Sequence, residues 1–239
     1  MKFYSLLICL LIVFSCEKEN TSPSFSEVNI LNEDVATIEI NMPMAQGNSQ
    51  VSEKINASLN EFVCSALHLD ASNEKQETIK ASITAFNESF SNFNTVISSE
   101  LKSELPVWEA FVDGELIYNN ETISCIAMNT SINTGAANTS MVFKFFNFDN
   151  KTGELLTTEE LVNNPSEFKI LVKQYYDKEI NATFNDVGIS TNVFKLPENL
   201  GFSDEGVIIL YDNFDLGSFE KEIIEFTIPY DVANPYLNI

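Results

Sequence analysis

The sequence contains no arginine, and all 13 of its basic residues are lysines. Arginine supplies the bidentate contacts that hold phosphate groups and read guanine. Carboxylates outnumber lysines by 35 to 13, which gives a formal charge of −22. This charge repels nucleic acid and anionic lipid surfaces. We therefore expect no nucleic-acid partner, and no membrane attachment through surface charge.

Catalytic groups are scarce as well. His68 is the single histidine, and the sequence has no nucleophile-elbow, dinucleotide-binding or phosphate-loop motif. His68 follows Cys64 by one helical turn, so these two residues, joined by Cys125, are a candidate metal or thiol site. Because no fourth ligand suggests itself, we expect no metal, no cofactor and no catalysis. An uncharacterised envelope hydrolase remains as an alternative, and it would need a carboxylate pair with shifted pKa values.

Residues 1–15 have the pattern of a secreted protein's leader. Lys2 is followed by an apolar run that is too short to span a bilayer. The run ends at Ser15 and Cys16, and the segment resembles a bacterial lipoprotein signal peptide, although Phe14 is larger than the residue usual there. The alternative is an ordinary secretory signal with a chance cysteine. We expect Cys16 to be lipidated and residues 16–30 to tether the protein to a bacterial membrane, at its periplasmic side or at the cell surface.

Two cysteines, Cys64 and Cys125, remain after the leader is removed and Cys16 is acylated. A disulfide between them is one option in an oxidising envelope. Buried free thiols are the other, and we expect these.

The remaining chain predicts an α+β fold, with an antiparallel or mixed sheet packed against amphipathic helices. Residues 35–44 alternate as a strand, and Asn48 and Ser49 then cap a helix. Apolar residues recur every three or four positions along residues 51–67 and 79–101, which is typical of helices. Shorter strands and helices follow over residues 107–112, 115–118, 123–132, 157–162, 207–211 and 223–228, and from Pro165. We expect two parts, residues 31–105 and residues 106–239, packed as one unit.

Several local features carry specific expectations. Asp113-Gly114 lies between two strand patterns and predicts a hairpin turn, and Asn119-Asn120 predicts another turn. Residues 140–149 carry apolar side chains on both faces of the expected strand, which predicts a strand in the middle of the sheet. A turn is expected at residues 150–153.

Several segments together resemble a known pair of domains. They are a strand, proline, loop and helix over residues 35–59, a turn at residues 133–138, an Asn-Phe-Asp and Thr-Gly run over residues 147–161, and closing segments at residues 201–206 and 226–230. The pair is similar to the extracellular part of RsiV-type anti-sigma factors, and to a domain that precedes some peptidoglycan deacetylases. Asn138 stands where the family often has His, and residues 212–217 keep little of the family's pattern. We expect neither sigma-factor regulation nor deacetylation.

The resemblance implies a binding module, because the anti-sigma proteins recognise lysozyme through this region. We therefore expect a non-catalytic envelope protein that binds a macromolecular partner, such as a lysozyme-like cationic protein, through loops at a sheet edge. The expected binding residues are Tyr211, Asp212, Asp215 and Asn138. Binding of peptidoglycan or another glycan is the alternative, for which exposed tyrosines would form a platform.

Lipidation of Cys16 is the first testable prediction. Labelled palmitate is expected in the native protein and absent from a Cys16→Ala variant, which should also leave the membrane fraction because no other anchor is predicted. Equal labelling of both proteins would contradict the assignment.

Overall fold

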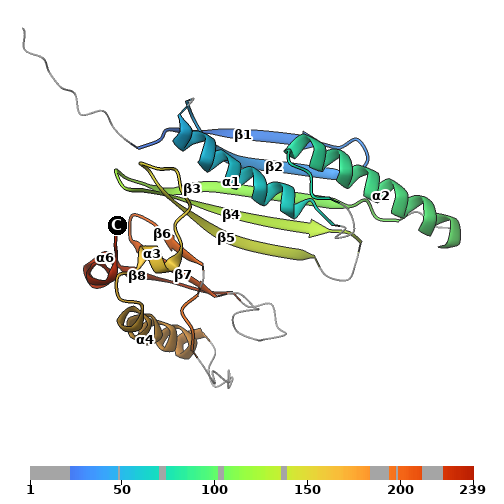
Figure 1. The fold of residues 1–239 in the computed structure, drawn as a ribbon. Coiled ribbons are helices and arrows are strands. Elements are labelled where there is room, and N and C mark those ends of the chain that lie inside the picture. The colour runs from blue at the N-terminus through green and yellow to red at the C-terminus, as the bar shows by residue number, and fades with distance from the viewer. Residues whose placement is uncertain are drawn as a thin grey trace, which may run out of the picture.

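A computed structural model describes residues 22–47, 49–69, 74–101, 105–135, 139–183, 194–197, 199–211 and 223–239. Their strands form two sheets, one of five strands and one of three. Helices α1 and α2 cover one face of the larger sheet, and the smaller sheet with α4 packs against part of the other face (Figure 1). This arrangement confirms the predicted α+β class.

The larger sheet is mixed, as predicted, and has the order β1-β2-β3-β4-β5. Its strands are β1 (Phe25–Asn32), β2 (Thr37–Ala45), β3 (Glu109–Asn119), β4 (Ile123–Asn133) and β5 (Ser140–Asp149). β2 and β3 run parallel, whereas the other neighbours are antiparallel. A parallel pair needs a long crossover, and α1 (Gln50–Ala66) and α2 (Ile79–Leu101) lie in it.

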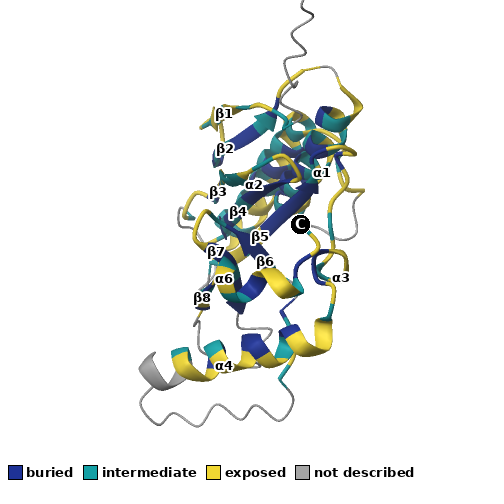
Figure 2. Cartoon of the chain, turned by 90° about the vertical axis from the view of Figure 1, so that its left-hand side faces the viewer, coloured by how far each residue is buried: buried dark blue, intermediate teal, exposed yellow. Residues whose placement is uncertain are grey.

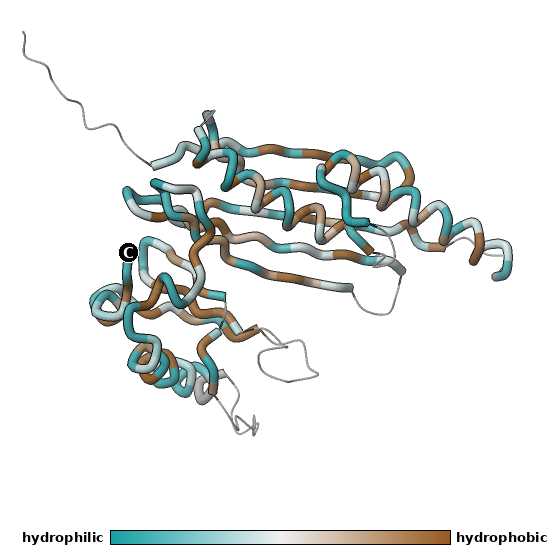
Figure 3. Tube along the Cα trace, viewed as in Figure 1, coloured by the Kyte–Doolittle hydropathy of each residue, from teal (hydrophilic) through white to brown (hydrophobic). Residues whose placement is uncertain are grey.

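Helix α1 begins at the predicted cap. The Ser49 side chain accepts a hydrogen bond from the Ser52 backbone N–H, which satisfies one free donor of the first turn. The apolar stripe then turns Ile55, Leu59 and Val63 onto the sheet, where all three are fully buried. Figure 3 shows apolar residues recurring along α1 and α2 as this packing requires.

Helix α2 is fixed to the sheet by one asparagine and one aromatic cluster. Asn87 Oδ1 accepts from the Ala36 N–H at 2.8 Å, and its Nδ2 donates to Asn32 Oδ1 at 2.8 Å, so the helix holds the β1–β2 hairpin. Phe90 and Phe93 lie 5.4 and 5.3 Å from the ring of Trp108. This packing keeps the helix continuous through the asparagines at 92 and 94, whose cost in helix propensity is small.

The smaller sheet and its helices form the second layer. Its strands are β6 (Leu200–Phe202), β7 (Gly206–Tyr211) and β8 (Ile224–Pro229), and its helices are α3 (Thr158–Leu161), α4 (Pro165–Thr183), α6 (Tyr230–Ala233) and the 3-10 turn η1 (Asn234–Tyr236). Figure 2 shows α4 with buried residues toward this sheet and exposed ones outside. Phe168 and Val172 of α4 are fully buried there. No helix among the described residues is long and apolar enough to cross a membrane.

The hairpin predicted at Asp113-Gly114 is wrong, because β3 runs straight through both residues. Gly114 is needed for close packing rather than for a turn. A Cβ there would meet Met128 Sδ and would lie 3.1 Å from Pro43 Cδ. The turn at Asn119 and Asn120 is confirmed: Asn120 Oδ1 accepts from the Ile123 N–H at 2.8 Å.

The middle position predicted for the strand over residues 140–149 is also wrong, because β5 is an edge strand. Its outer edge is nevertheless satisfied. Phe145 N–H donates to Asn199 Oδ1 at 2.7 Å, and Asn199 Nδ2 donates to Phe143 O at 2.9 Å. Further along, the Leu156 N–H donates to Asn147 O at 2.7 Å. The faces of the second half of β5 are buried by the two cores, with Phe146 and Phe148 in one and Phe145 in the other, which explains its apolar sequence.

The boundaries expected for the tether and for the two parts of the chain do not coincide with the structural units. β1 begins at Phe25, so residues 25–30 of the expected tether belong to the sheet. Thr37 of β2 pairs with Glu109 of β3, so the expected parts 31–105 and 106–239 share one sheet.

Gly114→Val should destabilise the fold by about 1–3 kcal/mol, since its side chain overpacks the contact of Met128 with Pro43. Glu115→Val is the matched control, because Glu115 is exposed. Urea unfolding measures both, and equal stability of the two variants would contradict this role of Gly114.

Candidate functional site

One end of the larger sheet lies away from the start of β1, and we call it the distal end. The β1–β2 hairpin, the start of β3, the end of β4 and the start of β5 meet there, as the pairs Thr37–Glu109, Glu109–Asn133 and Ile132–Ser140 show. Figure 1 shows α2 continuing beyond these strand ends, while the start of β1 and the C-terminus lie toward the other end.

Carboxylates occupy the sheet face that points away from α1 and α2. Strand alternation buries Ile38, Ile40 and Val112 under the helices and turns Glu39 and Asp113 to the opposite side. The smaller sheet covers the part of this face near Phe145. Among the described residues, nothing in the core clusters covers the remainder, which we call the acidic face. Its carboxylates are Glu39, Glu109, Asp113 and Glu115.

Exposed apolar side chains cross the acidic face in one row. Strand register places Leu31 opposite Glu39, Glu39 opposite Phe111, Phe111 opposite Ser131, and Ser131 opposite Met141. Leu31, Phe111 and Met141 are 63%, 37% and 65% exposed. A purely solvated sheet face has no need of such residues, and grouped exposed apolar residues mark interaction surfaces.

The distal end adds further apolar residues. Eight of the twelve large apolar residues exposed in the described chain lie on the acidic face or at this end. They are Leu31, Val35, Phe93, Val96, Val107, Phe111, Met141 and Val142. Singly scattered apolar residues are ordinary, but this concentration at one end is not.

Lysine is missing from the same surface. Strands β1 to β4 and residues 140–143 of β5 contain five carboxylates and no lysine. Lys144 of β5 lies on the helix side, with its ammonium 4.8 Å from the ring centre of Phe146. The acidic face and the distal end therefore combine negative charge, which attracts cationic groups, with exposed apolar area.

The residues expected to bind a partner are not brought together in the described part of the chain. Asn138, Asp212 and Asp215 lie outside the described residues, as does Cys16. Tyr211 is 4% exposed, and its hydroxyl donates to Lys195 O at 3.0 Å. It is a core residue at the end of β7, not part of a surface.

The tyrosines expected to form a platform are buried at Tyr176 and Tyr211 and half-buried at Tyr175, Tyr230 and Tyr236. Tyr176 is 3% exposed and packs edge-on against Tyr211 at 5.1 Å. Tyr230 donates to Ser203 O at 2.8 Å, and burial raises its pKa. These rings fill the core under α4 and α6, where apolar rings with one hydrogen-bonded tip pack well.

The cysteines are free thiols, as expected, and both are buried. Cys64 lines a cavity between α1 and α2 with His68, whereas Cys125 faces the core of the smaller sheet. The two thiols are on opposite sides of the larger sheet, so the candidate set of Cys64, His68 and Cys125 does not assemble. Among the described residues, no group of three or more His, Cys, Asp or Glu is placed to hold a metal.

Cys125 is unsuited to nucleophilic work at neutral pH. Burial raises the pKa of its thiol to about 12, although the Phe202 N–H donates to the sulfur at 3.3 Å. The reactive form of cysteine is the thiolate, so Cys125 acts as an apolar core residue.

Comparison with known proteins agrees with this fold. Residues 31–141, which are less than half of the chain, match the family model described as deacetylase PdaC. A DUF3298 family member from Bacteroides fragilis is similar over 92% of this chain and 96% of its own, with a TM-score of 0.70 and 13% identity. A DUF3298 protein from Pseudomonas aeruginosa covers 90% of this chain and 94% of its own, with a TM-score of 0.65 and 12% identity. No curated protein matches the sequence.

The chain thus has the fold of DUF3298 proteins, a class of domains of unknown function. The expected likeness to a domain of unknown function is confirmed at this level. At such low identity the likeness concerns the fold alone.

The excess of carboxylates in the sequence is compatible with an acidic face, but the sequence does not predict where this face lies, although part of its signal is visible. The alternation in residues 35–44 predicts a wet face that includes Glu39. The row of Leu31, Phe111 and Met141 depends on register between strands far apart in the chain, which alternation within one strand does not specify.

The raised pKa of Cys125 predicts a dependence of stability on alkaline pH. The folded state keeps the thiol neutral, so its contribution is fully present below the unfolded pKa, near 9, and is lost as pH rises toward 12. Cys125→Ala should be less stable at pH 7, but it should lose less stability between about pH 9 and 11. Chemical unfolding across this range measures the two slopes, and identical slopes would contradict the burial of the thiol.

Proposed function

We propose that this protein is a non-catalytic, lipid-anchored binding module of the bacterial cell envelope, and that its partner is a cationic protein. The observation that carries the proposal is the acidic face, where carboxylates without lysine surround a row of exposed apolar residues. Opposite charge speeds encounter and selects partners. Exposed apolar residues then supply the water-excluding contacts on which affinity depends.

The geometry is consistent with a tethered protein. β1 starts at Phe25, only a few residues after Cys16, and the distal end lies at the other end of the sheet. A protein held by a lipid on Cys16 would therefore present the distal end away from the membrane.

Three further features support binding rather than catalysis. His68 is half-buried beside α2, the Cys125 thiol is held neutral, and the described residues form no metal cluster. The resemblance to RsiV-type proteins makes a lysozyme-like protein the first partner to test.

The proposal is tested by titrating lysozyme into the soluble body, residues 22–239, in low salt. Asp113→Lys with Glu115→Lys should weaken binding by about tenfold or more, because it replaces attraction with repulsion at the contact. Glu121→Lys with Glu205→Lys is the control, since it changes the net charge equally at exposed turns elsewhere. Equal weakening by both pairs would show that only overall charge matters, and would contradict a localised site.

The apolar row has its own test. Phe111→Ser should weaken the complex by about tenfold, as loss of a buried aromatic anchor does, and this loss should persist at about 0.5 M salt, where surface charges are screened. Circular dichroism checks that the variant is folded. Unchanged affinity would remove Phe111 from the interface.

A further inference from the structure

A cavity of about 400 Å³ lies between the outer edge of β5 and helix α3, apart from the acidic face. Its walls are formed by the second half of β5, by residues 155–159 and by residues 196–197. Its volume is in the range of small-ligand sites, which is roughly 300–1,000 Å³. The proposed protein contact does not involve this cavity.

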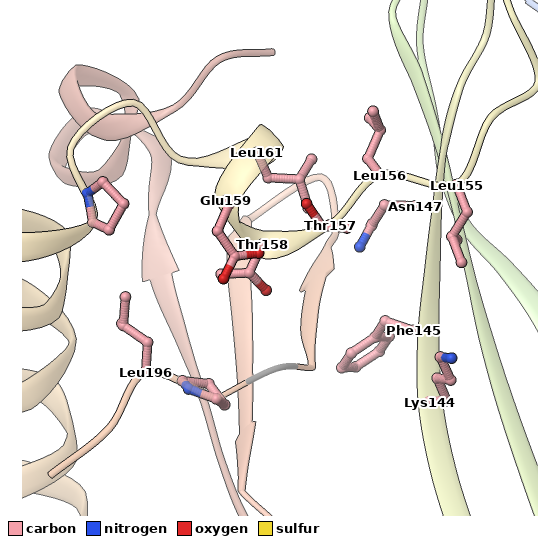
Figure 4. Close-up of a pocket in the computed structure, with 12 residues that line it drawn as sticks. Lys144, Phe145, Asn147, Leu155, Leu156, Thr157, Thr158, Glu159, Leu161 and Leu196 are labelled. Atoms are coloured by element: carbon pink, nitrogen blue, oxygen red, sulfur yellow. The ribbon is translucent and has the colours of Figure 1, made fainter.

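The side chains around this cavity divide into apolar walls and hydrogen-bond acceptors. Figure 4 shows Phe145 and Asn147 pointing from β5 toward the space below α3, and Thr158 and Glu159 pointing into it from above. Leu196 stands on the far side. Leu156, Leu161, Pro165 and Pro197 are among the other lining residues.

Asn147 holds an acceptor that the fold leaves unused. Its Nδ2 donates to Leu200 O at 2.7 Å, which sets the orientation of the amide. Its Oδ1 is buried and has no hydrogen-bond partner among the residues that the structure describes, and the residue is only 4% exposed. A buried acceptor without a partner costs about 1–3 kcal/mol, so a ligand that donates a hydrogen bond would recover this loss.

The charge of the cavity disfavours an anionic ligand, and its acceptors favour a ligand that donates hydrogen bonds. Glu159 places a carboxylate at the opening, which repels phosphate and carboxylate ligands. Lys144 contributes to the lining, but its ammonium points to the other side of β5, over Phe146. The cavity thus offers acceptors between two apolar walls.

The frame around the cavity is held by hydrogen bonds on both sides. Asn199 exchanges two bonds with β5, at Phe143 and Phe145. On the α3 side, Thr157 and Glu160 form a capping box. Glu159 is left outside this box, so its carboxylate is available to a ligand.

We propose that this cavity binds a neutral sugar ring of a glycan, whose hydroxyl or amide N–H groups donate to Asn147 Oδ1 and to the Glu159 carboxylate. A pyranose ring has apolar C–H faces and a hydroxyl-bearing rim, which match the apolar walls and the acceptors between them. The site is independent of the proposed protein contact, so either proposal stands if the other fails.

Calorimetric titration of residues 22–239 with three trisaccharides tests the assignment. The probes are an N-acetylglucosamine trimer, a glucose trimer and a cationic glucosamine trimer. Binding of either neutral trimer is expected, and preference for the acetylated one would assign an amide donor to Asn147. Binding of the glucosamine trimer alone would overturn the proposal in favour of an ammonium site, and no binding of any trimer would also overturn it.

Variants locate the binding in this cavity. Glu159→Ala should lower the affinity for the neutral trimer by about tenfold, as loss of a charged hydrogen-bond acceptor does. Leu196→Trp should abolish binding, because the larger ring fills the space opposite Phe145. Glu167→Ala is the control, since Glu167 lies in the first turn of the neighbouring α4 as Glu159 does in α3. Thermal unfolding confirms that each variant is folded, and equal affinities in all three would place the site elsewhere.

Discussion

The fold depends on β4 and β5 burying side chains on both of their faces. In β4, Ile126 and Met128 pack beneath α1 and α2, while Cys125 packs against the smaller sheet. In β5, Phe146 and Phe148 belong to the first core and Phe145 to the second. Because the side-chain period of a strand is two residues, a slip by one residue would exchange these two sets. This constraint fixes the register of the larger sheet and, through it, both candidate sites.

The same register separates the charges of the molecule. Strands β1, β2 and β3 carry carboxylates and no lysine, whereas α4 carries three lysines, and exposed ion pairs join Lys54 to Glu154 and Lys173 to Asp177. Exposed pairs of this kind add little stability. The segregation therefore has little to do with holding the fold together and much to do with which molecules approach the acidic face.

Features that depend on local sequence were predicted well. The two long helices are predicted by apolar residues spaced three or four apart. The N-cap role of Ser49 is predicted by its position just before the first helix. The turn at Asn119 and Asn120 follows from the tendency of asparagine to form such turns. Free thiols at Cys64 and Cys125 were also anticipated.

Features that depend on distant contacts were not predicted. Gly114 looks like a turn residue, yet it lies mid-strand because Met128 and Pro43 approach it closely. The apolar sequence of β5 predicts a central strand, but β5 is an edge strand. Its outer backbone groups hydrogen-bond to Asn199, which is more than fifty residues away in the sequence. The strand β6 is only three residues long, too short for a periodic signal. Tyr211 has the character of a surface residue, and only its neighbours Tyr176 and Phe194 reveal it as core.

The most direct test of the account is to locate the partner contact in living cells. A photoreactive amino acid placed at Phe111, which is exposed on the acidic face, should crosslink to a basic protein. The same group at Ile170, which is exposed on α4 at the other layer, should not. A basic protein joined through position 111 alone is the predicted result, and crosslinks through position 170 but not 111 would contradict the central claim.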